Sequence, residues 1–469
     1  MGGFQMDSLN KPAREKRRGA AAVISMFFII VFSALTVSMV SLSDSSVQIS
    51  ANHRKANNAL AAAESGLEIL RYWLSHVSLS GNTPSSELFT EVAESLQNDL
   101  TTNGLTNITA GYNGSVITIP SVTLDSSGDQ NFSVTMTRLD TDTIQADVVG
   151  THGEINRALR TTFRLGERAN TVFNYGVATK GPLSLAGNIE LEGVNVSVES
   201  SVYIESENSN VALSIVGNSQ IAGDVAIVNS LASVDMQGGQ ASIGGERGEA
   251  AIENHVSFGV APSEFPDPEP QYFLPYVTDA IDANTDTTAD AVFENIFIPA
   301  GTNPTFTGHV TLKGIVYVQP PNVVTFEGTA DVIGIIVGDG EMEDNSGINQ
   351  INFLGTVHSE PIDHLPAEPQ FAGLHDQAGT FVVAPGFELS FGGTFDTLNG
   401  AIAANGVEFF GNAGGIINGS IINYSDEPMH LSGNSDLYFN RSGTSTIPPG
   451  FIPDVVLYYE PTSYSEVTL

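Results

Sequence analysis

The sequence predicts an α+β fold followed by an all-β region, in which a long N-terminal helix and a small antiparallel sheet precede a β-helix or similar β-solenoid. Three observations support this prediction. An uncharged apolar run near the N-terminus continues into a heptad stripe, several β-rich runs follow it, and a glycine-containing phrase recurs from residue 184 onward. The length of 469 residues suits about two to four domains.

The N-terminal run predicts one continuous helix from about residue 21 to 78. No residue from Gly19 to Ser43 is charged, and a helix of that length covers about 37 Å, enough for a hydrocarbon core of about 30 Å. We expect residues 20–43 to be a transmembrane helix, with Ala20, Phe27 and Val40 facing the membrane. Residues 44–80 continue it as an amphipathic helix, because apolar residues recur at heptad spacing. The members of this stripe are Ala56, Leu60, Ala63, Leu67, Leu70, Leu74 and Val77.

Charge is distributed very unevenly along the chain. The formal net charge is −36, yet basic residues crowd residues 11–18, and from residue 170 onward the basic residues are Lys180, Arg247, Lys313 and Arg441. A basic segment before an apolar helix favours the cytoplasmic side, with the remainder exported. The acidic body disfavours nucleic acid as a partner. The absence of cysteine excludes disulfides and thiol catalysis.

Residues 16–42, beginning "KRRGAAAVISMFF", resemble the class III signal of the type IV pilin superfamily. The resemblance implies a leader of residues 1–19, cleavage by a prepilin peptidase after Gly19, and a new N-terminus at Ala20. Most major pilins have a glutamate five residues after the cleavage site, where this chain has Ile24. Together with "ALAAAESGLE" at residues 59–68, this departure makes the chain more similar to minor pilins of the PilX N-terminal type. A minor pseudopilin of type II secretion is the nearest alternative.

Residues 81–168 predict a small antiparallel domain. A short amphipathic patch at Leu88–Leu100 is typical of a helix, and β-rich runs occupy residues 114–124, 131–139, 143–152 and 156–165. Three or four antiparallel strands on the lower half of the long helix would bury the heptad stripe. This arrangement also matches the pilin plan that the resemblance implies.

The distal part predicts a β-solenoid in two blocks, residues 169–260 and 297–447. The phrase polar–apolar–x–Gly, followed by Asn, Thr or His, appears as "SLAGN", "SIVGN", "TFTGH", "TFEGT", "NFLGT", "SFGGT" and "LSGN". Spacings near twenty residues, with variable insertions, are typical of solenoid turns. A β-sandwich or a propeller is the alternative fold.

One segment separates these two blocks, and another follows the second block. Residues 261–296 read as a Pro-rich and acidic linker whose second half could hold a short helix, and residues 448–469 as a C-terminal cap or tail.

Candidate chemistry in the distal part is sparse. Polysaccharide cleavage would need clustered carboxylates with a histidine and a nearby basic residue, and the candidates are "NTD" at 284–286, "GHV" at 308–310, Lys313 and Arg441. We predict no catalytic residues and no enzyme. Calcium is the one cofactor considered, and its weak candidate ligands are Asp339, Glu341 and Glu343. His358, His364 and His375 are a second candidate metal set, but a surface insertion is favoured because long Pro-containing loops scatter such residues.

These observations predict a non-enzymatic minor pilin-like protein of the inner (cytoplasmic) membrane, single-pass, with its C-terminal region periplasmic or on the cell surface. Expected partners are prepilin peptidase, other pilin or pseudopilin subunits, the membrane and surface glycans bound by an adhesive solenoid. A permanently anchored periplasmic solenoid is the first alternative, and an anchored polysaccharide-acting enzyme is the second.

Overall fold

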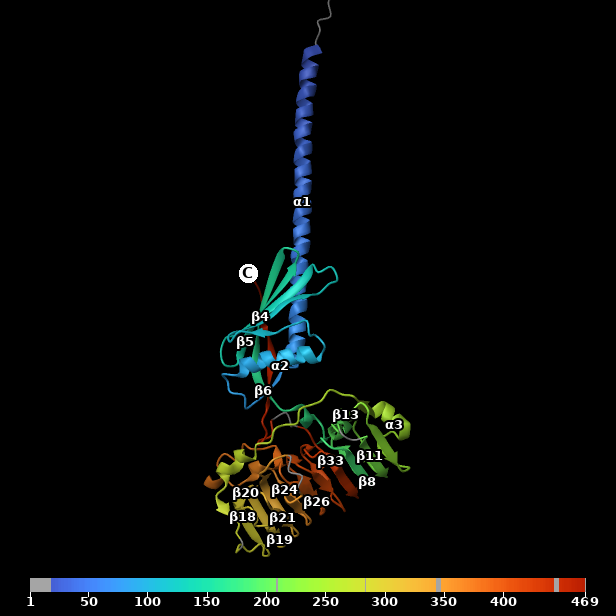
Figure 1. Ribbon diagram of the computed structural model, residues 1–469, viewed down its shortest axis with the longest axis vertical. Coiled ribbons are helices and arrows are strands. Elements are labelled where there is room, and N and C mark those ends of the chain that lie inside the picture. The colour runs from blue at the N-terminus through green and yellow to red at the C-terminus, as the bar shows by residue number, and fades with distance from the viewer. Residues whose placement is uncertain (1–17, 208–209, 283, 343–346, 443–446, 469) are drawn as a thin grey trace, which may run out of the picture. The chain divides into compact units, whose positions relative to one another are not determined.

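The computed structural model describes residues 18–207, 210–282, 284–342, 347–442 and 447–468. The chain divides into two compact units (Figure 1). The first comprises the described residues of Met1–Val77, Ser85–Leu165 and Leu457–Leu469, and the second comprises Ser78–Pro84 and Gly166–Val456.

The first unit is a long helix packed on an antiparallel sheet. Helix α1 is Arg18–Ser75 and helix α2 is Leu88–Thr102. The sheet has the strand order β1-β34-β6-β5-β4-β3-β2 within the described residues. Its strands are β1 (Ser78–Ser80), β2 (Gly111–Tyr112), β3 (Val116–Thr123), β4 (Gln130–Arg138), β5 (Thr143–His152), β6 (Ile155–Arg168) and β34 (Asp454–Val467). Strand β1, the end of β6 from Gly166 and the start of β34 up to Val456 are counted with the second unit.

The heptad stripe of α1 is buried from Ala63 to Leu74 and continues to Val77, as the sequence predicts. The helix lies very close to β5, because a Cβ on Gly150 would stand 2.2 Å from the carbonyl oxygen of Ala59 and from the amide nitrogen of Ala63. Glycine at this position therefore lets helix backbone and strand backbone approach each other.

The C-terminal segment differs from the expectation of a solenoid cap or tail. Residues 454–467 form β34, which lies between β1 and β6 in the sheet of the first unit. Tyr459 packs on Phe163 with ring centroids 5.7 Å apart, and Arg71 of α1 lies over the Tyr459 ring at 4.3 Å. Aromatic residues of the tail thus complete the packing of this sheet, which the sequence pattern alone did not indicate.

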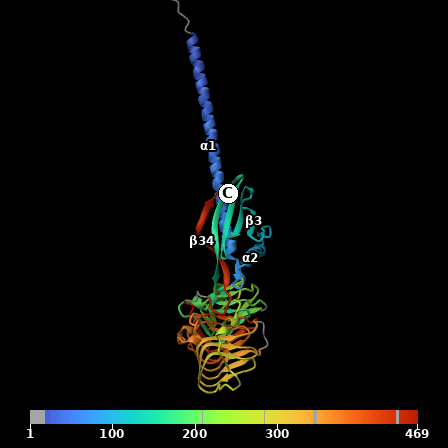
Figure 2. The same ribbon diagram turned by 90° about the vertical axis from the view of Figure 1, so that its left-hand side faces the viewer.

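The second unit contains three sheets whose described pairs are parallel (Figure 2). The twelve-stranded sheet comprises β7 (Val177–Thr179), β10 (Val202–Ile204), β13 (Val225–Ile227), β16 (Val256–Phe258), β17 (Asp279–Ala280), β18 (Ala291–Ile298), β20 (Val310–Val318), β22 (Ala330–Gly338), β24 (Val357–Glu360), β25 (Thr380–Ala384), β28 (Ala401–Ala404) and β31 (Ile421–Asn423).

The other two sheets are smaller. The nine-stranded sheet comprises β8 (Leu183–Gly187), β11 (Val211–Gly217), β14 (Ser233–Gln237), β19 (Thr305–Phe306), β21 (Val323–Phe326), β23 (Gln350–Phe353), β26 (Glu388–Phe391), β29 (Val407–Phe409) and β32 (Met429–Gly433). The six-stranded sheet comprises β9 (Glu190–Gly193), β12 (Gln220–Ile221), β15 (Ser242–Ile243), β27 (Thr397–Leu398), β30 (Gly415–Ile417) and β33 (Asp436–Phe439). The remaining helices are α3 (Gly248–His255) and five short 3₁₀ turns, at Thr171–Asn174, Ser197–Ser200, Pro270–Tyr276, Ile362–His364 and Pro369–Phe371.

The two blocks that the sequence separates belong to the same sheets. Strand β7 pairs with β10 on one side and with β31 on the other, in registers Val177↔Val202 and Val177↔Ile421. The first strand of this unit therefore lies inside the sheet and not at its edge, because the last strands of the unit pair with the first ones. The segment expected to hold a short helix after the Pro-rich linker instead forms β17 and β18.

The recurring phrase forms the core of this unit. Five phenylalanines stack along the nine-stranded sheet with ring centroids 4.8–5.1 Å apart and planes within 8–11° of parallel. They are Phe306, Phe326, Phe353, Phe391 and Phe409. The glycine of the phrase also stacks, since a Cβ on Gly355 would lie 1.9 Å from the carbonyl oxygen of Gly328. Asparagine side chains also form a chain of hydrogen bonds along this unit. Asn418 donates to Asn399 over 2.7 Å, and Asn440 donates to Asn418 over 3.1 Å.

The twelve-stranded and nine-stranded sheets differ in what covers their outer faces. Central strands of the twelve-stranded sheet, such as β25 and β28, are buried on both faces, because a second apolar cluster that includes Phe273 and Phe371 packs on its outer side. These strands accordingly read as continuous apolar runs. Strands of the nine-stranded sheet alternate buried and partly exposed residues, as in β21 and β23. Its outer face is therefore available to solvent.

Substitution of Gly355, which stacks against Gly328, tests the packing of the second unit. Gly355→Ala is expected to lower the free energy of unfolding by about 1–3 kcal/mol, because the new methyl group meets backbone that cannot move aside. Gly239→Ala is the matched control, since a Cβ there would meet nothing within 4 Å, and it is expected to change stability by less than about 0.5 kcal/mol. Chemical denaturation followed by far-ultraviolet circular dichroism measures both, and equal effects would contradict the stacked-glycine account.

Candidate functional site

The N-terminal helix carries the first candidate site. Gly19 and Ala20 lie in the first turn of α1, and most of the leader expected at residues 1–19 lies outside the described residues. Every described side chain from Ala21 to Ser50 is exposed, and Phe27 and Val40 are 69% and 56% exposed. The described chain has one helix, Ala21–Ser75, that is long and apolar enough to cross a membrane.

The expected calcium and histidine ligands do not form a common site in the structure. Asp339 accepts a hydrogen bond from the Gly340 amide over 2.8 Å, and Glu343 lies outside the described residues. The three histidines have separate partners: Asp396 at 3.2 Å for His358, Glu360 at 3.3 Å for His364, and the Asp363 carbonyl at 3.4 Å for His375. Among the described residues, no group of three or more His, Asp or Glu side chains is arranged to hold a metal ion.

The residues considered for polysaccharide chemistry are also dispersed. Lys313 is 3.7 Å from Glu294, and His309 is 2.6 Å from Asp331. Arg441 donates to the carbonyl oxygens of Glu199 and Val198 over 3.0 and 2.9 Å, and also to that of Asn174. It therefore joins the end of the second block to the beginning of the first.

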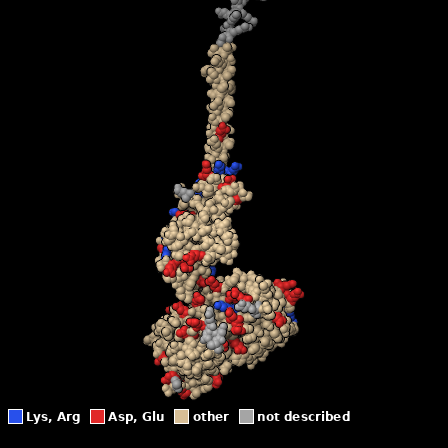
Figure 3. Space-filling view, viewed as in Figure 1, with Lys and Arg blue, Asp and Glu red and all other residues tan. Residues whose placement is uncertain are grey.

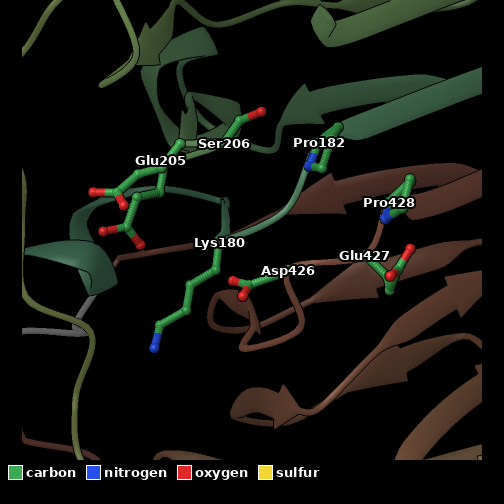
Figure 4. Close-up of a pocket in the computed structure, with 8 residues that line it drawn as sticks. Lys180, Pro182, Glu205, Ser206, Asp426, Glu427 and Pro428 are labelled. Carbon is green, nitrogen blue, oxygen red and sulfur yellow. The ribbon is translucent and has the colours of Figure 1, made fainter. Parts of the chain in front are cut away.

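A pocket around Lys180 is a feature that the sequence analysis did not predict. It has a volume of about 470 Å³, and Figure 4 shows Lys180 between Glu205 and Asp426. The Lys180 ammonium also lies 5.5 Å from the ring centroid of Phe265 and 5.9 Å from that of Tyr424. The one sequence feature that could have indicated this pocket is that lysine is rare in an acidic region. Figure 3 shows the many acidic and few basic side chains on one face of the molecule.

A second pocket of about 420 Å³ is also lined by Lys180 and Glu205, together with residues of the Pro-rich segment such as Pro262 and Glu264. Burial raises the pKa of Glu205 against the opposing effect of Lys180, and burial together with neighbouring carboxylates raises the pKa of Glu264. Burial is also the main cause of the raised pKa of Asp454, which accepts a hydrogen bond from Asn170 over 2.6 Å. This region thus holds several carboxyl groups whose charged forms are disfavoured.

Comparisons with known proteins assign no family to this chain. No family model matches it, and no curated protein matches it. Among solved structures, the competence-associated pilin ComZ from Thermus thermophilus aligns with 13% identity over 88% of this chain and 97% of that chain, with a TM-score of 0.23. We base no inference on a match with so low a TM-score.

The raised carboxyl pKa values predict a pH dependence of stability. A carboxyl whose pKa is higher in the folded state binds protons more tightly there, so its contribution favours folding below the unfolded pKa of about 4 and is lost as pH rises through the folded pKa. Glu264→Gln removes one such group. The variant is therefore expected to lose less thermal stability than the wild type between about pH 4 and pH 7.

Thermal denaturation of both proteins across that range measures the difference. Lys180 and Arg168 are the cations near these carboxyls, and Asp267, Glu207 and Asp426 are the additional anions. Glu253→Gln, an exposed change on α3, is the charge-matched control and is expected to keep the wild-type slope. If the thermal stability of Glu264→Gln fell with pH as steeply as that of the wild type, the side chain of Glu264 would have to be solvated in the folded protein.

Proposed function

We propose that this chain is a membrane-anchored minor pilin-like protein that takes part in assembly of a type IV pilus or a pseudopilus. The observation that carries the proposal is the continuity of α1, in which one helix is fully exposed and apolar in its first half and packed on its own sheet in its second half. Such a helix needs an apolar environment outside its own unit. Lipid supplies that environment before assembly, and the helices of other subunits supply it afterwards.

The residues around Gly19 support processing before assembly. A basic segment precedes Gly19, and an uncharged apolar run follows Ala20. Prepilin peptidase would cut after Gly19, leaving Ala20 as the N-terminus and the basic segment on the cytoplasmic side. Ile24, where a shaft subunit would have glutamate, favours a minor subunit.

The second unit is, in this proposal, a β-solenoid displayed in the periplasm or on the cell surface for adhesion. The support is the order in which the first block visits the twelve-, nine- and six-stranded sheets, as in β7, β8, β9 and then β10, β11, β12. Each pass pairs in parallel with the next, so that backbone hydrogen bonding runs along the stack.

A permanently anchored periplasmic protein that never enters a filament is the second candidate. Ile24 favours it as well, because glutamate at that position helps to register subunits in the pilins that this segment resembles. The two candidates differ in whether the leader is removed.

Mass spectrometry of the N-terminus tests the first proposal. In cells with an active prepilin peptidase, we expect the mature chain to begin at Ala20, and we expect Gly19→Val to retain residues 1–19 while still inserting into the membrane. Gly2→Val is the control within the leader and is expected to be processed normally. An intact N-terminus on the wild-type protein in such cells would favour permanent anchoring instead.

A further inference from the structure

The outer face of the nine-stranded sheet presents polar side chains in register. Asn352, Ser390, Glu408 and His430 occupy equivalent positions on four successive strands, β23, β26, β29 and β32. Neighbouring strands lie about 4.8 Å apart, so these side chains form a regular column. Ser390 donates to the Asn352 side chain over 2.7 Å, which holds two of its members in fixed orientations.

A groove lies beside this column, and Gly406 is one of the residues that line it. Gly406 lies next to Glu388 in the neighbouring strand, and a Cβ on Gly406 would approach the Glu388 Cγ to 3.3 Å. The groove has a volume of about 370 Å³, and Phe410 and Pro428 contribute apolar surface to it. This volume is within the range of roughly 300–1,000 Å³ that small-ligand pockets occupy.

The charge of the groove indicates the charge of its ligand. Among the described residues that line it are three carboxylates, Glu388, Glu408 and Glu427, and no lysine or arginine. An anionic ligand would be repelled, and an uncharged one would leave these carboxylates without a cation. A ligand with amino groups would complement the groove.

We propose that this groove binds a glycan that carries free amino groups. The carboxylates would accept hydrogen bonds from the ammonium groups, while the amides and hydroxyls of Gln350, Asn352 and Ser390 would bind the sugar hydroxyls. The ring of Phe410 offers a surface for the apolar face of a sugar ring. The inference deepens the proposed adhesive role of the second unit and does not depend on whether the chain enters a filament.

A basic peptide has the same charge but fits the groove less well. Immobilising a lysine or arginine side chain costs conformational entropy, whereas a sugar ring holds its amino and hydroxyl groups rigidly. The groove side chains are themselves anchored on strands at a regular spacing. A rigid ligand with repeated polar groups therefore gains more from this surface than a flexible one.

Fluorescence polarisation with the detergent-solubilised full chain tests the proposal. The labelled probes are a glucosamine hexamer, an N-acetylglucosamine hexamer, cellohexaose and hexalysine. The first three share a β-1,4-linked backbone and differ in having an ammonium, an acetamide or a hydroxyl group. We expect the glucosamine hexamer to bind about tenfold or more tightly than the N-acetylglucosamine hexamer and cellohexaose, as the loss of one charge-assisted interaction implies. We also expect it to bind more tightly than hexalysine, whose flexible side chains lose more conformational entropy on binding.

Matched variants locate the binding. Glu388→Gln with Glu408→Gln is expected to weaken the glucosamine hexamer by about tenfold or more. The control, Glu190→Gln with Glu192→Gln, makes the same charge change on β9 of the six-stranded sheet and is expected to change affinity by less than about twofold. The melting temperature of each variant establishes that it is folded.

Three outcomes would overturn the inference. Hexalysine binding as tightly as the glucosamine hexamer would identify the groove as a site for basic peptides. Equal weakening by both variant pairs would show that net charge alone attracts the ligand, and lack of binding by every probe would remove the site. None of these outcomes alters the N-terminal processing result, so failure here is distinct from failure of the proposed pilin-like role.

Discussion

The second unit depends on the long-range pairing of its last strands with its first, in which β31, β32 and β33 pair with β7, β8 and β9, and the pairing of β7 with β31 illustrates it. The two strands are separated by more than two hundred residues of chain, yet Val177, Ala178 and Thr179 align with Ile421, Ile422 and Asn423 without a register shift. Without this pairing the unit would consist of two shorter stacks, each with an open edge. Closing so long a loop is entropically costly and slow, so the contact must be stabilised by more than backbone hydrogen bonds.

Buried polar contacts supply that additional stabilisation. The amide of Asn423 donates to Thr179 over 2.9 Å, and both residues are fully buried. Glu199 accepts hydrogen bonds from the amides of Asn195 and Arg441, and these bonds lower its pKa although burial acts in the opposite direction. Because Arg441 and Glu199 come from different blocks, their contacts are available only when β31 has reached β7. These contacts also favour one arrangement over others, because a different pairing would leave the same buried polar groups without partners.

The sequence predicted local features well and long-range order poorly, for a physical reason. The phrase containing Phe353 and Gly355 could be recognised because a stacked ring and a stacked glycine each tolerate few alternatives. The same phrase cannot indicate which turn lies next to which, since all copies present similar surfaces. The pairing of β7 with β31 and the placement of β34 beside β6 were therefore not predictable from periodicity. The candidate groove was missed because Asn352, Ser390 and Glu408 resemble any solvent-facing positions until their register is known.

The contrast between the sheets indicates where binding surfaces can exist in this chain. The twelve-stranded sheet has apolar residues on both faces, and Phe273 and Phe371 lie in the apolar cluster on its outer side. The nine-stranded sheet keeps its apolar residues on the inner face, so its outer positions are free of packing constraints. Residues on this outer face, such as Gly406, can therefore differ in size without weakening the phenylalanine stack on the other side of the sheet. A unit built in this way separates the residues that determine its stability from those that would determine its ligand, and the ligand specificity could change while the stack is retained.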